Sequence, residues 1–236
     1  MLLTSSVPTL LKRAGVVCLL VAGAQFGFAR CPGMDSDSHF QKLDETSMVR
    51  VFTLQLERLE STAKHCHEHA FFYVVTSDSE TNDTLEGHAG IGRKWRAGAA
   101  RFVQNPETHI IRNETATVHR EVIVEILNRL EYNPLNPGYD TEDFSGDGSP
   151  QISSTTWTVP VQHGPMGAVK AQIMPGNKLN FDASTKILIA LTDGTLQGLG
   201  KDFELSRQDV QLISSDSEFT LTNTGRFPIR FISIRY

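Results

Sequence analysis

The stretch Arg120–Ile126, with the sequence REVIVEI, carries apolar residues at every second position. Val122, Val124 and Ile126 alternate in it with the intervening residues, and a period of two is typical of a β-strand. Similar alternation recurs in short runs at 51–56, 169–173, 210–212, 219–221 and 232–234. Many short strands separated by turn residues predict an all-β fold, either a sandwich or a barrel. No convincing helix is predicted after residue 30.

A second copy of this pattern lies 110 residues further along the chain. With that offset, Asn113 aligns with Asn223, Arg120 with Arg230, Val122 with Ile232 and Val124 with Ile234. Upstream, the run 51–56 is paired more loosely with 169–174, and 72–75 with 188–191. The sequence therefore predicts two copies of one β-unit that pack together.

Composition divides the chain into four predicted parts. Residues 1–29 are expected to be a signal peptide, 30–130 a first β-unit, 131–164 a linker or long loop, and 165–236 a second β-unit. The linker is rich in Asn, Pro, Gly, Asp and Ser, which favours a loop. Its acidic residues lack the D-x-D-x-D-G order of a calcium loop, so a solvated acidic loop is expected.

The signal peptide is predicted from the order of residues at the N-terminus. Lys12 and Arg13 precede a short apolar run, Ala14–Ala24, and small residues follow it. That order is typical of a secretory signal, and the run is too short to span a bilayer. We expect cleavage after Ala29 and a secreted or periplasmic protein. No later stretch is apolar enough to predict a membrane span.

Charge and cysteine usage exclude several classes of protein. The chain has 236 residues, with 22 Lys and Arg against 27 Asp and Glu, and no basic cluster to neutralise phosphates. A nucleic-acid partner is therefore not expected. Cys18 lies in the predicted signal, which leaves Cys31 and Cys66. Two cysteines do not make a disulfide framework, although they could pair with each other in an oxidising compartment. Because Cys31 is expected to lie in a loose tail, two unpaired thiols are expected.

Histidines supply the candidate chemistry. His65, His67 and His69 stand at alternate positions in KHCHEHAFFYVV (64–75), and on a strand such residues project to the same face. Two neighbouring imidazoles can share a metal ion, and His109 is a third candidate ligand. The alternative is a polar edge strand with exposed imidazoles. Neutral imidazoles suit Zn, Fe, Cu or Ni better than Mg or Ca.

These residues resemble the two motifs of the cupin superfamily. The first motif, G-x5-H-x-H-x3–4-E-x6-G, is matched by His65-x-His67. The second, G-x5-P-x-G-x2-H-x3-N, is matched by Gly98, His109 and Asn113. The resemblance covers roughly residues 50–130 and is echoed more weakly over 165–236. It implies a bicupin, two small jelly-roll β-barrels in one chain.

Several motif positions depart from the family pattern. The metal-binding glutamate of the first motif falls near Phe71 or Phe72, neither of which binds a metal. The opening glycine is Leu59, and in the second motif the proline is Gln104 and the glycine is Pro106. An alternative alignment uses His67 and His69 as the pair and places Tyr73 at the acid position, again without a carboxylate.

What remains is a three-histidine site. The resemblance implies that His65, His67 and His109 hold a divalent transition metal such as Fe, Zn, Mn, Ni or Cu, with His69 as a substitute or fourth ligand. Some cupin dioxygenases use three histidines and no glutamate. In the second copy Phe219 replaces His109, and the histidine pair falls on Asn180 and Asp182 or on Asp182 and Ser184, so no second metal site is expected.

Two classes of function follow. The first is an oxidoreductase of dioxygenase type, or an isomerase, that acts on a small molecule at the histidine centre. The second is a non-catalytic module that binds a small ligand or serves a structural role. The expected partners are a small molecule and, because cupins commonly pair through their sheets, a second copy of the chain. No catalytic residue is assigned by the sequence.

Overall fold

The computed structural model describes residues 31–103, 106–127, 156–163 and 166–236. The predicted signal peptide and most of the predicted linker, including its acidic residues, lie outside the described residues. Within them, no helix is long and apolar enough to cross a membrane. The one helical element there is the short 3-10 helix η1, Met34–Ser36. The described chain is otherwise built from strands, as predicted.

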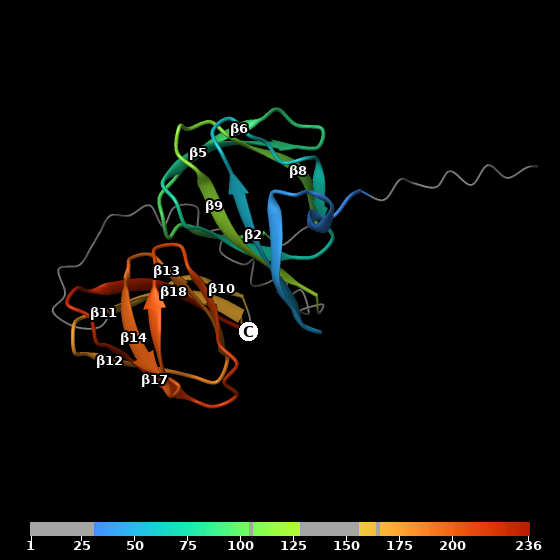
Figure 1. Cartoon of the computed structure of the whole chain (residues 1–236). Coiled ribbons are helices and arrows are strands. Elements are labelled where there is room, and N and C mark those ends of the chain that lie inside the picture. Colours follow the sequence, from blue (N-terminus) through green and yellow to red (C-terminus); the bar gives the residue numbers. More distant parts are fainter. Residues whose placement is uncertain (1–30, 104–105, 128–155, 164–165) are drawn as a thin grey trace, which may run out of the picture. The chain divides into compact units, whose positions relative to one another are not determined.

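The first half of the described chain forms two antiparallel sheets, which together are called the N-terminal sandwich (Figure 1). The five-stranded sheet has the order β1 (Phe40–Glu45), β2 (Val49–Leu56), β9 (His119–Ile126), β4 (Phe71–Val75), β7 (Ala100–Val103). The four-stranded sheet has the order β3 (His65–His67), β8 (Glu107–Asn113), β5 (Ser79–Leu85), β6 (Ile91–Trp95). Strands adjacent in space are mostly not adjacent in sequence, as in a jelly roll.

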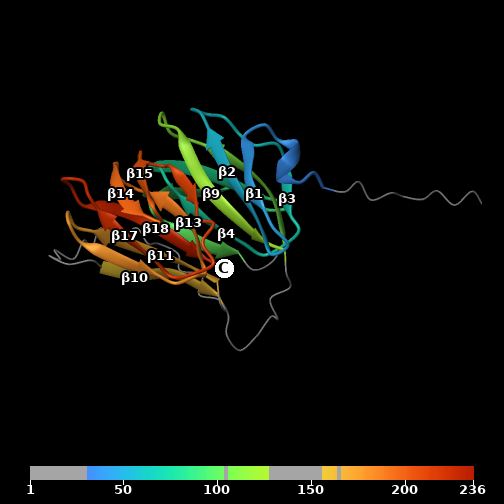
Figure 2. The same ribbon diagram turned by 60° about the horizontal axis from the view of Figure 1, so that its bottom comes forward.

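The second half forms the C-terminal sandwich. Its five-stranded sheet has the order β10 (Thr156–His163), β11 (Met166–Ile173), β18 (Ile229–Arg235), β13 (Thr185–Ala190), β16 (Val210–Leu212). Its four-stranded sheet has the order β12 (Lys178–Phe181), β17 (Phe219–Asn223), β14 (Gly194–Gly198), β15 (Lys201–Leu205). Figure 2 shows the strands of the two five-stranded sheets. Strand β10 lies inside the stretch 131–164 that was expected to be a loop.

The strand order confirms the internal repeat. Each strand of the N-terminal sandwich has its counterpart nine strands later, and the order is the same in both pairs of sheets. Asn113 and Asn223 also make the same bonds. The Asn113 amide donates to the carbonyls of Leu56 and Thr117, and the Asn223 amide to those of Ile173 and Phe227. Each buried asparagine therefore ties a strand end to the turn that follows.

The looser upstream part of the repeat prediction is wrong by one residue. Val51 pairs with Val124 on β9, and Ala168 pairs with Ile234, the counterpart of Val124, on β18. The counterpart of Val51 is thus Ala168, one position before the predicted 169. Phe72 likewise corresponds to Ile187. Because a shift of one residue reverses the face of a strand, an apolar pattern alone leaves such a register undetermined when both faces are buried.

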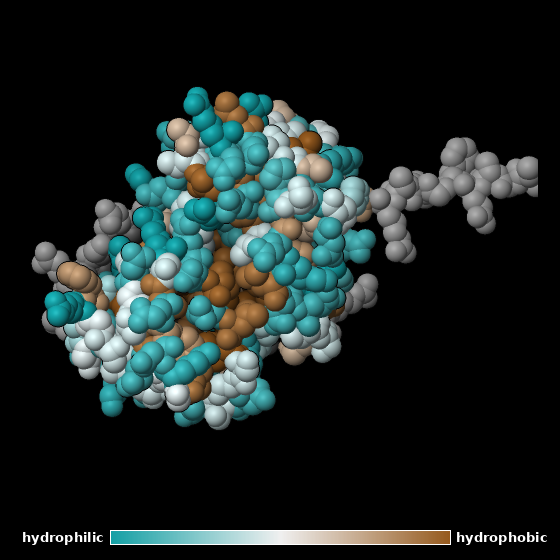
Figure 3. Space-filling model, viewed as in Figure 1, coloured by the Kyte–Doolittle hydropathy of each residue, from teal (hydrophilic) through white to brown (hydrophobic). Residues whose placement is uncertain are grey.

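Both faces of the central strands of the five-stranded sheets are buried. One face of each packs on its own four-stranded sheet, and the other belongs to an apolar cluster that contains residues of both sandwiches, among them Val122 and Val124 of β9 with Ile187 and Ile232 of the C-terminal sheets. Strands β4 and β9 are consequently buried almost throughout. Most of the surface shown in Figure 3 is hydrophilic, with apolar residues in a minority.

A disulfide joins Cys31 to Cys66, so the expectation of two unpaired thiols is wrong. The Cα atoms are 5.8 Å apart. Cys66 also donates its backbone N–H to the carbonyl of Pro32 at 2.9 Å, and Gly33 forms a bridge with Cys66. The segment before η1 therefore covers the edge of β3 that does not pair with β8. The error arose because a tail with no sequence pattern was expected to be loose.

The asparagine contacts lead to a stability prediction. Asn113→Ala removes an amide that donates to three carbonyls, of Leu56, Glu57 and Thr117, and leaves them without that partner. We expect a loss of about 1–3 kcal/mol in the free energy of unfolding, measured by urea denaturation. Asn223→Ala should have a comparable effect, whereas the exposed Asn180→Ala should have almost none. An unchanged midpoint for Asn113→Ala would contradict this role.

Candidate metal centre

Two neighbouring strands bring three histidines together. His65 and His67 lie at the ends of β3, and His109 lies on β8 directly opposite His65. All three point into the space between the two sheets and are buried. One ligand atom of each lies within 4.8 Å of the others. The structure therefore brings the three predicted ligands together in a cluster that could hold a metal ion.

Each imidazole is oriented through its Nδ1 atom. Nδ1 of His67 lies 3.2 Å from Oε1 of Glu125, Nδ1 of His65 lies 3.1 Å from the Ala63 carbonyl, and Nδ1 of His109 lies 3.3 Å from a carboxylate oxygen of Glu107. An oxygen acceptor beside Nδ1 favours a proton there and leaves the lone pair on Nε2. Metal-binding histidines generally have such a partner, which fixes the ring and raises its basicity as a ligand.

The distances between nitrogen atoms suit a metal ion. The Nε2 atoms of His67 and His109 are 3.3 Å apart. Two nitrogen ligands at 2.0–2.1 Å from a tetrahedral ion would be about 3.3–3.4 Å apart. The Nε2 atom of His65 is buried and has no hydrogen-bond partner, which is unusual for a buried polar atom. A cation bound by all three Nε2 atoms would satisfy it, so the residues present fit a metal.

Burial keeps two of these histidines, His65 and His109, neutral. Desolvation, with a smaller contribution from the neighbouring His65 and His67, lowers the pKa of His109 to about 2. Desolvation also lowers the pKa of His65 to about 4. The imidazoles of His65 and His109 therefore stay unprotonated over the ordinary range of pH, and a metal does not have to displace protons from these two rings.

His69 is not part of this group. It follows the end of β3, is half-buried, and lies outside the cluster of three histidines in the described part of the chain. The alternation that places His65 and His67 on one face holds only while the strand continues. The chain leaves the strand at Glu68, so the third alternate histidine is not brought to the same point.

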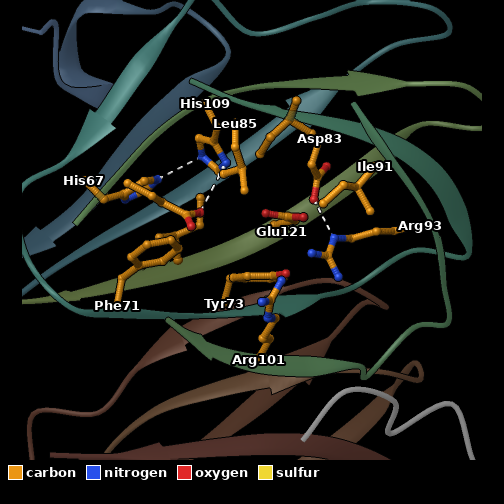
Figure 4. Close-up of a pocket in the computed structure, with 13 residues that line it drawn as sticks. His67, Phe71, Tyr73, Asp83, Leu85, Ile91, Arg93, Arg101, His109 and Glu121 are labelled. Carbon is orange, nitrogen blue, oxygen red and sulfur yellow. Dashed lines mark hydrogen bonds and ion pairs between the residues drawn. The ribbon is translucent and has the colours of Figure 1, made fainter. Parts of the chain in front are cut away.

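A cavity opens beside the histidines (Figure 4). Its wall combines apolar side chains with charged ones, and the charged residues are Asp83, Arg93, Arg101, Glu107 and Glu121. Asp83 accepts a hydrogen bond from Arg93 at 2.9 Å, although desolvation still raises its pKa. Tyr73 lines the same wall, and burial raises the pKa of its hydroxyl. Such a mixture of apolar surface and a few convergent polar groups is typical of a small-molecule site.

Several solved structures are similar to this chain and share its architecture. A cupin 2 conserved barrel domain protein from Leptotrichia buccalis matches with a TM-score of 0.56 at 11% identity, over 83% of this chain and 87% of the other. AerE from Microcystis aeruginosa matches with a TM-score of 0.58 at 13% identity, over 84% and 97%. A salicylate 1,2-dioxygenase from Pseudaminobacter salicylatoxidans matches with a TM-score of 0.56 at 11% identity, over 82% and 75%.

This chain has the cupin fold. The matches extend over both sandwiches, so the fold is that of a bicupin, as the motifs implied. No protein-family model matches the sequence, and no curated protein matches it either. The fold is therefore evident from the three-dimensional arrangement and from the histidine spacing, while the similarity in sequence is low.

The second cupin unit has no histidines at the equivalent positions. The residue that replaces His65 there differs from the predicted one. Phe181 of β12 lies opposite Phe219 of β17, as His65 lies opposite His109. The counterpart of His65 is thus Phe181, one residue from the predicted Asn180 and Asp182. The two phenylalanine rings stack with centroids 4.9 Å apart. An apolar pair fills the place that the imidazoles occupy in the first unit.

The acidic residues around the three histidines were not predicted from the sequence. Glu121 and Glu125 lie in the run REVIVEI, whose alternation was used only to predict a strand. In the structure Val122 and Val124 belong to the cluster shared by the two sandwiches, and the glutamates face the space between the sheets of the first. Two glutamates at alternate positions of a central strand were the available signal. Phe71, at the position of the missing family glutamate, stacks on His67 with centroids 3.8 Å apart.

The depressed pKa values predict how metal binding depends on pH. The usual pKa of a histidine is 6.5, and exposed histidine sites lose metal as protons compete below that value. Here competition at His65 begins only near pH 4. Titration with Zn²⁺ should give a dissociation constant that weakens less than about tenfold between pH 7 and pH 5.5, because His65 and His109 contribute no proton competition there. Folding is followed by circular dichroism. A hundredfold weakening over that interval in folded protein would contradict buried, neutral His65 and His109.

A second prediction concerns the carboxylate behind His67. Glu125 lies 3.2 Å from His67 and 2.6 Å from Arg50, and its side chain is 1% exposed. Glu125→Gln keeps the size of the side chain and removes the charge that holds the imidazole, so metal affinity should fall about 10–100-fold. The exposed Glu204→Gln is the control and should bind metal as the wild type does. Equal affinity for both variants would show that Glu125 does not support the centre.

Proposed function

We propose that this bicupin is a metal-dependent enzyme of dioxygenase type, which oxidises a small molecule in the cavity beside His65, His67 and His109. The convergence of the three imidazoles, each oriented through Nδ1, is the observation that carries the proposal. A bound divalent transition metal would supply a Lewis acid and, if it is redox-active, a place for dioxygen. Iron is the metal that suits this reaction class.

The protein's own residues have separate tasks in this proposal. The three histidines would hold the metal beside the cavity. Glu125, Glu107 and the Ala63 carbonyl keep the rings in place. Apolar residues of the wall exclude water, and the charged ones orient a polar substrate. Burial of the centre between the sheets strengthens each of these electrostatic contacts.

The structural neighbours support a small substrate. One similar structure, with a TM-score of 0.57 at 10% identity, is a salicylate 1,2-dioxygenase described in adducts with gentisate. That ligand belongs to the neighbour. For the present chain we infer only the class, a small polar molecule that fits a cavity lined by arginines, carboxylates and aromatic rings.

A non-catalytic binding module is the second candidate. One observation favours it: the position of the family glutamate is held by Phe71, which packs flat against His67 and offers no ligand or proton acceptor there. In that case the same centre would bind a metal and a small ligand without turnover.

We also propose that the protein is exported. The N-terminal order of a basic pair, a short apolar run and small residues supports this proposal. The Cys31–Cys66 disulfide supports it independently, because disulfides persist mainly in oxidising compartments. A secreted or periplasmic location is the resulting expectation.

Metal analysis followed by oxygen uptake tests the function. Protein purified without chelators should contain about one transition metal ion per chain by mass spectrometry. His67→Ala should lose at least nine-tenths of it. The matched control is His69→Ala, which removes a histidine two residues away that lies outside the cluster and should keep the metal.

The iron-loaded protein should then consume oxygen with at least one member of a panel of phenolic acids, diketones and thiols, and His67→Ala should not. Stoichiometric metal without oxygen uptake from any member would favour the binding module. A wild type that folds and binds no transition metal would refute both candidates.

A further inference from the structure

A chain of buried polar groups leads from the interior of the N-terminal sandwich to the cavity wall. Ser79 of β5 lies 2.7 Å through its hydroxyl from Nδ1 of His119, and Nε2 of His119 lies 2.8 Å from Oε1 of Glu121. His119 is 0% exposed, Glu121 is 5% exposed and Ser79 is 6% exposed. Burying three polar side chains away from water costs free energy, so their burial needs a structural or functional reason.

The end of this chain that faces the cavity is the carboxylate. Glu121 lines the cavity, and Figure 4 shows it in the middle of the site, between His109 and Asp83. Ser79 and His119 are not among the residues that line the cavity. The order is therefore opposite to that of a hydrolase, in which the serine hydroxyl faces the substrate. The chain presents a carboxylate and does not present a nucleophilic hydroxyl.

The other acidic residues near the centre each have a charged or ligand-holding partner. Asp83 accepts a hydrogen bond from Arg93, and Glu107 lies beside Nδ1 of His109. Glu125 lies between His67 and Arg50. Each of these three carboxylates therefore contacts an arginine or an imidazole ring of the metal centre. Glu121 lies in the cavity wall, and among the described residues its hydrogen-bond partner is His119.

The hydrogen bonds specify how the proton can move. With the proton of His119 on Nε2, the imidazole donates to Oε1 of Glu121, and Nδ1 accepts from the Ser79 hydroxyl. Glu121 then serves as an acceptor through both oxygens. A proton that arrives on Oε2 leaves the bond from His119 to Oε1 intact. The arrangement holds the carboxylate in one position before and after protonation.

We propose that Glu121 takes a proton from a hydroxyl group of the ligand, with His119 and Ser79 as its positioning residues. This proposal rests on the proposed metal-dependent function and names the class of ligand: a small molecule with an ionisable hydroxyl. In the step, the O–H bond of the ligand breaks, an O–H bond forms at Oε2 of Glu121, and the oxyanion is left facing the three histidines. No electron is transferred.

The surroundings of Glu121 favour this step over simple ion pairing. Besides His67 and His109, the charged and titratable groups that share its cavity are Asp83, Glu107, Arg93, Arg101 and Tyr73. Because the two acids oppose the two arginines, Glu121 sees little net excess of positive charge. A bound metal would make the hydroxyl of the ligand more acidic, and a carboxylate within reach would then accept its proton.

The test uses the full chain loaded with Zn²⁺ and the chromophore 4-nitrocatechol, whose absorption spectrum distinguishes its monoanion from its dianion. Zinc is chosen because it does not oxidise the probe. The wild type should bind the dianion at neutral pH. Glu121→Gln retains an acceptor for His119 and cannot take a proton, so it should bind the monoanion, at least tenfold more weakly.

The role of His119 is tested by rescue. His119→Ala should lose the dianion spectrum, and His119→Gln should restore it, because a glutamine amide can donate to Glu121 and accept from Ser79. A merely structural histidine would not produce this difference in the spectrum of the probe. Glu80→Gln, at an exposed position of β5, is the matched control and should behave as the wild type.

Zinc content separates this proposal from the function on which it rests. If the wild type binds no zinc, the proposed function fails and the inference falls with it. If zinc is bound, a dianion spectrum in Glu121→Gln equal to that of the wild type overturns the inference alone. Failure of the zinc-loaded wild type to bind the probe, or binding of the monoanion by it, overturns the inference as well.

Discussion

The pairing of β3 with β8 is the constraint on which the site depends. Strand β3 has three residues, and its two histidines reach the centre only because His65 lies opposite His109 in the ladder. The other edge of β3 is covered by the segment that begins at Cys31, through the Pro32 carbonyl and the disulfide to Cys66. A strand so short would have little stability alone. Cys66, which lies between His65 and His67, thus anchors the strand that carries both histidines.

The two cupin units show two solutions for the interior of one scaffold. In the first, buried imidazoles require acceptors for their Nδ1 atoms, and the unit supplies two glutamates and a carbonyl. In the second, Phe181 and Phe219 stack in the equivalent positions and need no polar partner. The surrounding strand order is unchanged. The same arrangement of strands therefore accommodates either buried imidazoles with their acceptors or an apolar pair of side chains.

Strand β9 connects the fold to the chemistry. Its valines belong to the apolar cluster shared by the two sandwiches, while Glu121 and Glu125 face the opposite way, toward the cavity and the centre. One central strand thus carries two acidic groups of the site on a face that is buried between sheets. Charged groups persist there because each has a hydrogen-bonding partner, His119 for Glu121 and His67 with Arg50 for Glu125.

The sequence by itself determined the all-β class, the doubling of the unit and the three clustered histidines, because each depends on local spacing: the period of two, the 110-residue offset, and H-x-H with H-x3-N. Tertiary structure alone decided which side of β9 is the inside, the one-residue registers of the upstream repeat and of Phe181, the exclusion of His69, and the disulfide of Cys66. Those features depend on which strand lies beside which. A strand buried on both faces has no side exposed to solvent, so polar residues in its sequence do not show which side is outside, and only the pairing with its neighbours fixes it.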